Sequence, residues 1–152
     1  MTLYTLLQEC RAIAEDHDAI QYTEIGHEWD ISAQEENYMA MWLETPVVVS
    51  YIRSQTKQYS MAINVLQLCD DYDNLDAVIQ LTSDCEDVGD DIIHALTDRL
   101  KSIKAMISIT DVQAVSLRHF TTADLVGMRY DITFNVQSNY CSYPSKMSNP
   151  DG

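Results

Sequence analysis

One long amphipathic segment constrains the fold of this chain more than any other feature. From Leu75 to Lys104, apolar residues recur at the spacing of one helix face, and acidic residues occupy the opposite face. The apolar half of this predicted helix contains Leu75, Val78, Ile79, Cys85, Gly89, Ile92, Ile93, Leu96, Leu100 and Ile103. Such a helix is expected to bury its apolar face against another layer of secondary structure.

The ends and the middle of this segment carry further signals. Asn74 or Asp73 is a suitable N-cap, and Lys101 and Lys104 suit the negative end of the helix dipole. Gly89 costs about 1 kcal/mol relative to Ala inside a helix, yet it lies in the middle of the apolar face. It indicates either a close approach of the helix backbone to a sheet or a kink between two shorter helices.

Alternating patterns typical of strands lie on both sides of the long helix. Tyr59–Val65 and Gly127–Gln137 place apolar and polar residues at alternate positions. A first amphipathic helix is predicted over Leu3–His17, with Thr2 as its N-cap. Further strands are expected over 19–32 (two short strands around Gly26 and His27), 38–45, 47–53 and 112–120.

This order of elements predicts an α+β fold. We expect a two-layer sandwich in which a mostly antiparallel sheet carries both helices on one face. The other face is expected to carry Trp42 or its neighbours together with polar residues, and to be partly exposed. A chain of 152 residues suits a single domain. We place that domain over residues 1–138 and expect residues 139–152 to form an extended C-terminal arm.

The charge balance excludes several classes of partner. The chain has 24 acidic and 9 basic residues, which give a net charge of −15. A protein of this charge is not expected to bind nucleic acid through its overall field, because DNA is itself a dense polyanion. No apolar stretch is long enough for a membrane span and no signal peptide is evident at Met1–Tyr4. The four cysteines form no C-x-x-C pair, so we expect reduced thiols in a protein made in a cytoplasm.

Motifs for catalysis or metal binding are not found. The acidic run Asp70–Asn74 fails the calcium-loop pattern, because the sixth position from Asp71 is Asp76 and the twelfth is Thr82. The histidines and cysteines lack zinc-site spacing. There is no nucleophile motif and no phosphate-binding glycine loop. We therefore predict no catalytic residues, no metal, no cofactor and no enzymatic activity.

Two sets of residues are candidates for interactions. The acidic side of the long helix contains Asp84, Asp87, Asp91 and Asp98 near one stripe. This stripe either keeps the protein soluble, repels a polyanion that passes close by, or docks on a basic neighbour. A subunit interface is predicted at Trp42, Tyr51, Tyr140, Tyr143 and Pro144, because aromatic side chains on an uncovered sheet face and in an extended arm are typical of protein contacts.

A family resemblance covers nearly the whole chain up to Pro144. It rests on ordered segments, which are Leu3–Leu7 with Ile13–His17, Gly26–Ile31, Met39–Pro46, Tyr59–Leu66, Ser83–Asp84, Phe120, Gly127, Asp131–Phe134 and Asn139–Pro144. In these the chain resembles the small head–tail joining proteins of tailed bacteriophages, of the tail-terminator or tail-completion type. The versions that it resembles occur in phages of Bacteroidetes hosts, including crAss-like phages.

The resemblance implies a structural role in the virion. Such proteins are non-enzymatic subunits of closed rings in the neck, with six or twelve copies around the DNA channel. The implied partners are other copies of the chain and the portal, neighbouring neck-ring or tail proteins, and DNA passes through without specific binding. The stripe of Asp84, Asp87, Asp91 and Asp98 is then expected to face the lumen. The alternatives are a tail-tube or tail-hub component, or a small acidic adaptor or inhibitor that binds a basic partner.

Overall fold

The computed structural model describes residues 3–26, 39–53, 56–102, 107–120 and 125–137. Its elements, in chain order, are α1 (Leu3–Asp16), β1 (Ile20–Gly26), β2 (Met39–Glu44), β3 (Val48–Arg53), β4 (Thr56–Leu68), α2 (Leu75–Ser102), β5 (Ile107–Phe120) and β6 (Leu125–Gln137). The predicted α+β class is confirmed, and most boundaries fall close to those expected, but β5 begins at Ile107, five residues before the predicted start, and β4 extends beyond Tyr59–Val65 at both ends. The second short strand expected after Gly26, the end of the long helix beyond Ser102 and the arm at 139–152 lie outside the described residues.

The strands form one sheet in the order β1-β2-β4-β6-β5. The sheet is mostly antiparallel, as predicted, but β1 and β2 run parallel. The thirteen residues of β4 are long enough to pair on the same side with two strands, β2 along one part and β3 along the other. The cis peptide bond between Thr45 and Pro46 lies between those two strands.

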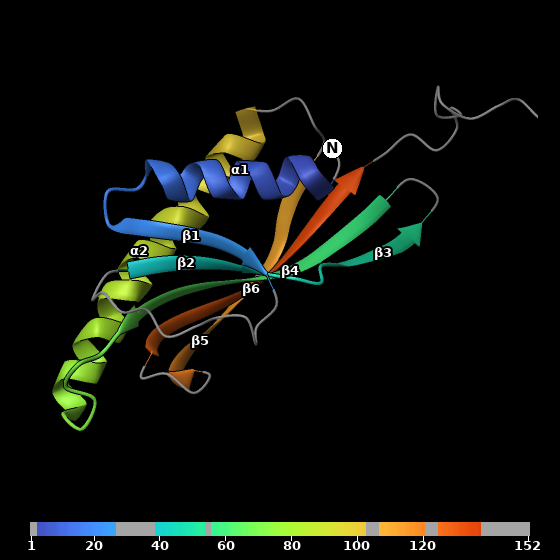
Figure 1. Cartoon of the computed structure of the whole chain (residues 1–152). Helices are drawn as coiled ribbons and strands as arrows, with labels where there is room; N and C mark the ends of the chain where they lie inside the picture. Colours follow the sequence, from blue (N-terminus) through green and yellow to red (C-terminus); the bar gives the residue numbers. More distant parts are fainter. Residues whose placement is uncertain (1–2, 27–38, 54–55, 103–106, 121–124, 138–152) are drawn as a thin grey trace, which may run out of the picture.

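Both helices pack on one face of the sheet, which is also as predicted (Figure 1). The main core contains side chains of α1, α2 and the alternate residues of β2, β4 and β6 that point toward the helices. At the start of α2 the prediction was wrong, because Leu75 and Ile79 are exposed and only Val78 of that turn is buried. In this turn Val78 packs against Val126 of β6, whereas Leu75 and Ile79 face away from it. The helix is capped by Asn74, whose Oδ1 accepts hydrogen bonds from the backbone amides of Asp76 and Ala77.

Gly89 lies where α2 packs directly against a side chain of the sheet. A Cβ atom at this position would lie 2.2 Å from the hydroxyl oxygen of Tyr130 on β6 and about as close to two of its ring atoms. The Tyr130 hydroxyl donates a hydrogen bond to the backbone oxygen of Glu86, one turn earlier in the helix. The helix is continuous from Leu75 to Ser102, so of the two interpretations of Gly89 the close approach is the correct one.

Substitution of Gly89 tests this contact. We expect Gly89→Ala to lower the free energy of unfolding by up to about 2 kcal/mol, because overpacking a core costs typically 1–3 kcal/mol while the gain in helix propensity is only about 1 kcal/mol. Urea denaturation measures the difference, with Ser83→Ala on the exposed side of the same helix as the control. A Gly89→Ala protein about 1 kcal/mol more stable than the parent, the full gain in helix propensity, would show that Tyr130 does not restrict the helix.

Candidate assembly surfaces

The sheet face that points away from the helices is part apolar and part polar. Trp42, Leu66 and Leu125 form a small buried cluster on this face, and Leu68 and Leu117 pack against it. The Trp42 indole nitrogen donates a hydrogen bond of 3.1 Å to the backbone oxygen of Gly26. Trp42 is only 6% exposed, so the prediction that it lies on an exposed subunit interface is corrected. The Trp42 side chain instead packs beside β1 on the sheet face that points away from the helices.

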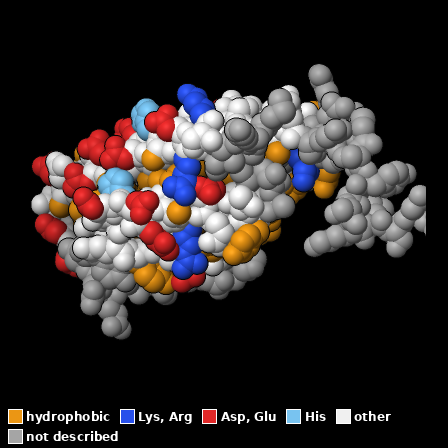
Figure 2. Space-filling view, turned by 90° about the horizontal axis from the view of Figure 1, so that it is seen from above, with side chains coloured by type: hydrophobic (Ala, Val, Ile, Leu, Met, Phe, Trp, Pro, Cys, Tyr) orange, Lys and Arg blue, Asp and Glu red, His pale blue; other side chains and the backbone are white. Residues whose placement is uncertain are grey.

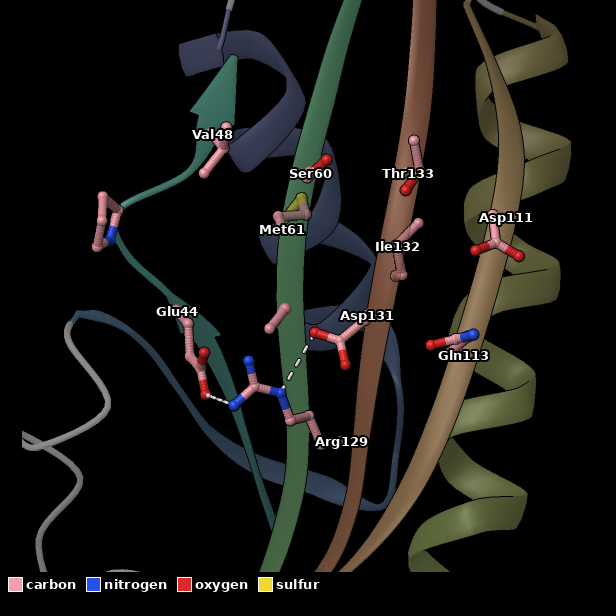
Figure 3. A pocket seen from close by; sticks show the side chains of 12 residues that line it. Glu44, Val48, Ser60, Met61, Asp111, Gln113, Arg129, Asp131, Ile132 and Thr133 are labelled. Carbon is pink, nitrogen blue, oxygen red and sulfur yellow. Dashed lines mark hydrogen bonds and ion pairs between the residues drawn. The ribbon is translucent and has the colours of Figure 1, made fainter. Parts of the chain in front are cut away.

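A polar network continues from this cluster along the same face. Glu44 accepts a hydrogen bond of 2.9 Å from the Asn64 side-chain amide. It also forms an ion pair of 3.1 Å with the Arg129 guanidinium. Arg129 also contacts Asp131 at 3.3 Å. Figure 3 shows Glu44, Arg129 and Asp131 on the side of the strands opposite the helices. The guanidinium thus lies between two carboxylates, one nearly buried and one half-exposed.

This network forms one end of a shallow hollow of about 340 Å³ (Figure 3). Its polar lining comes from Glu44 on β2, Ser60 on β4, Asp111 and Gln113 on β5, and Arg129, Asp131 and Thr133 on β6. Its charged lining comprises three carboxylates and one guanidinium. None of the described residues that line it is a histidine, cysteine or lysine, so this lining has the character of a negatively charged docking surface.

A second hollow of about 410 Å³ lies between the two helices and contains a His–Asp pair. His17 Nε2 lies 3.0 Å from Asp91 Oδ2, and His17 Nδ1 accepts a hydrogen bond from the backbone amide of Ala19. In the neutral ring the proton is therefore on Nε2 and is donated to Asp91. Both ring nitrogens are occupied in joining the end of α1 to α2. Arg99 and Glu9 form a further ion pair between these helices.

The described cysteines lie in the core as unbridged thiols. Burial raises the pKa of Cys10 to about 12, with a smaller contribution from Glu9, and burial likewise raises the pKa of Cys85 to about 12. A thiol with such a pKa is not a ready nucleophile. Among the residues that the structure describes, no three His, Cys, Asp or Glu side chains gather to hold a metal ion. No helix within the described ranges has the length and apolar character needed to cross a membrane.

The acidic side of α2 is exposed. Between Leu75 and Ser102 there are seven acidic and two basic residues, and Figure 2, viewed from the side of α1, shows acidic side chains gathered at one end of the molecule. Asp87 and Asp98 are exposed, Asp91 contacts His17, and Asp84 is partly buried and accepts a hydrogen bond from Gln80. The predicted stripe therefore lies on the surface, but two of its four members also have local structural contacts.

Strand β5 has an unusual environment that the sequence did not reveal. It is the last strand of the sheet and pairs only with β6 among the described strands. Every residue from Thr110 to Ser116 is exposed. Val112 pairs with the core residue Ile132, and Val115 pairs with Arg129 on the opposite face. The side chains of this stretch are thus accessible on both faces of the sheet, and no described strand pairs with its outer edge.

A second exposed apolar strand lies on the other side of the sheet. In β3 the side chains of Val48, Tyr51 and Ile52 are exposed, Tyr51 to 69%. Tyr51 is therefore accessible, as its predicted place in an interface requires. Tyr140, Tyr143 and Pro144, the remaining predicted interface residues, lie outside the described residues. The sequence signal that could have pointed to β3 as an interface strand is its apolar and β-branched composition, which includes no acidic residue.

Comparisons with known proteins add no relative. No protein-family model matches the chain, and no curated protein sequence matches it significantly.

The Glu44–Arg129 pair yields a stability test. We expect Arg129→Met to lower the free energy of unfolding by about 1–3 kcal/mol, because it leaves the nearly buried Glu44 carboxylate with a single amide partner. Asp131→Asn removes the half-exposed contact and should cost less than about 0.5 kcal/mol. Chemical denaturation of both variants measures this difference. Equal losses would show that the burial of Glu44 is unimportant, and Glu44→Gln in the Arg129→Met background should restore part of the loss.

Proposed function

We propose that this protein is a structural subunit of an oligomeric ring in the neck or tail of a tailed bacteriophage, a head–tail connector of the tail-terminator type. The observation that carries the proposal is the exposure of β5 at its edge and on both faces from Thr110 to Ser116. An exposed edge strand with few charges is a template for pairing with another chain, and proteins that remain monomeric protect such edges. Within this stretch Asp111 is the only charged residue.

The sequence resemblance to head–tail joining proteins supplies the place of action. Contacts between unlike surfaces of identical copies close into a ring when the rotation that relates neighbouring copies is a whole-number fraction of a full turn. A ring around a DNA channel, with six or twelve copies, uses the protein as scaffold and needs no cofactor or catalytic group. Its neighbours along the channel are portal, neck-ring or tail proteins. This assignment places the protein in the virion after its synthesis in the host cytoplasm.

The charge of the chain suits a channel that DNA crosses. A net charge of −15, with an exposed acidic side on α2, opposes adhesion of a polyanion. We assign this role to the stripe around Asp87 and Asp98, whose side chains are exposed.

The acidic side of α2 also favours a second candidate function. A small acidic adaptor or inhibitor would dock this face on a basic protein. Such a protein binds one partner and stays monomeric, whereas a ring subunit associates with itself. A tail-tube or tail-hub component is the alternative within the virion. Oligomeric state and position in the particle separate the three.

Self-association is the direct test of the ring. We expect light scattering and native mass spectrometry of the purified chain to show a large species that grows with protein concentration and has a single copy number, six or twelve. We also expect several copies of the chain per particle at the capsid vertex or tail in micrographs of intact virions. A chain that stays monomeric at all concentrations and is absent from virions would refute the proposal.

The role of the acidic face is tested by charge reversal. We expect Asp87→Lys with Asp98→Lys to reduce genome delivery by at least about tenfold while rings still form, because lysines in a channel would bind passing phosphates. Infectivity and particle counts together measure delivery. The matched control is Asp18→Lys with Asp73→Lys, which makes the same change in net charge at exposed positions outside α2. Equal delivery by both double variants would remove the lumen assignment.

A further inference from the structure

Among the described strands, large apolar side chains that are at least half exposed occur at two places on the rim of the sheet. One is the stretch Thr110–Ser116 of β5, where Val115 is 53% exposed, and the other is β3, where Ile52 is 50% exposed. The remaining rim strand, β1, carries Glu24, whose carboxylate accepts hydrogen bonds from the Tyr22 hydroxyl and the Ile25 amide. A charge on an edge strand protects that edge from pairing. Strands β5 and β3 also carry charged residues, Asp111 and Arg53, so the high exposure of their apolar side chains is what distinguishes them from β1.

These two strands lie on opposite sides of β4. Strand β3 pairs with one side of β4, whereas β6 pairs with the other side and carries β5 beyond it. Figure 1 shows β3 extending away from the part of the sheet that holds β5. A contact that joins β5 of one copy to β3 of another leaves one free strand at each end, so it propagates from copy to copy.

The two strands also match in length and charge. Six residues of β3 span about 20 Å, close to the span of the seven exposed residues of β5. Residues 47–60, which contain β3 and the turn to β4, hold two basic residues and no acidic residue in a chain of net charge −15. The hollow, which extends from Val48 of β3 to Asp111 of β5, presents Asp111, Asp131 and Glu44 with a single guanidinium among its described lining residues. A basic hairpin and an acidic sheet face attract each other, and two copies of either surface do not.

We propose that the outer edge of β5 in one copy pairs with the outer edge of β3 in the next copy, so that one sheet continues across the subunit boundary. This inference rests on the proposed self-assembly and names the surfaces that perform it. Backbone hydrogen bonds between the strands satisfy the open edges, and the side chains of Val115 and Ile52 become buried on association. The partner that covers β5 is thus a second copy of this chain.

Complementary blocked variants test the pairing. Val115→Lys blocks β5 and leaves β3 intact, while Ile52→Lys blocks β3 and leaves β5 intact, because each places a charge in the buried contact. Ile79→Lys, at an apolar residue of α2 that is 54% exposed, is the matched control. We expect each blocked variant to associate at least about 100-fold more weakly than the parent chain, on the scale of an interface hot spot, and the control to form the same large species as the parent.

Mixing the two blocked variants gives the decisive result. An equal mixture should form a one-to-one dimer that grows no further, because the intact β3 of one variant meets the intact β5 of the other. Native mass spectrometry identifies that dimer by mass. If Ile52→Lys alone still dimerises, β5 pairs with itself and the proposal is overturned. A mixture that stays monomeric, a blocked variant that forms the large species, or loss of assembly by Ile79→Lys overturns it as well.

Two further arms keep these outcomes interpretable. Circular dichroism and thermal unfolding establish that each variant is folded, and Val115→Thr and Ile52→Thr, which retain β-branched side chains, replace any lysine variant that is not. With these replacements the same pattern is expected at a weaker level, about tenfold. If the parent chain itself is monomeric and absent from virions, the proposed function fails. If the parent assembles and the blocked variants do too, only the strand assignment fails.

Discussion

The contact of α2 with β6 at Gly89 determines which parts of the sheet are covered. Because Gly89 has no side chain, the helix backbone approaches Tyr130 closely enough for the tyrosine hydroxyl to bond to Glu86. The helix is therefore held over β6 and the neighbouring strands, and its exposed side carries the acidic residues. The middle of β5 stays exposed, although its residues pair with β6, most of whose apolar residues are buried. A single small residue thus links the position of the acidic face to the exposure of the edge strand.

The second face of the sheet is stabilised by different means at its two ends. Near β1 the indole of Trp42 closes a small apolar cluster. Further along, Glu44 and Arg129 form an ion pair that a buried amide from Asn64 supports. Gly127 belongs to the same design, since a Cβ atom there would lie 1.9 Å from the carbonyl oxygen of Val65 on β4. Close approach of neighbouring strands and pairing of opposite charges thus stabilise the sheet face that lies opposite the helix layer.

Sequence periodicity predicted the fold well because one face of each helix and alternate residues of β4 and β6 point toward the main core. The alternation at Tyr59–Val65 and the apolar face of α2 both correspond to residues that contact the main core. It failed where burial depends on distant neighbours. From the sequence, Trp42 has the pattern of an exposed interface residue in an aromatic strand. In the structure it is buried beside β1, on the sheet face that points away from the helices. Leu75 and Ile79 fit the helix pattern but face away from β6. The exposure of β5 was not predictable either, since an alternating strand at the edge and one at the centre share the same pattern.

The distribution of charge explains why assembly through strand edges is compatible with a net charge of −15. The β3 hairpin has no acidic residue, so electrostatic repulsion between copies is weak there. Attraction between this hairpin and the sheet face around Asp111 of the next copy opposes the remaining repulsion. In the proposed ring every copy repeats the same contact, so every copy also presents α2 at the same radius and on the same side. The acidic side chains of all copies then form one continuous band. Such a band arises from the symmetry of a single strand contact, because no residue of α2 needs to touch the neighbouring copy.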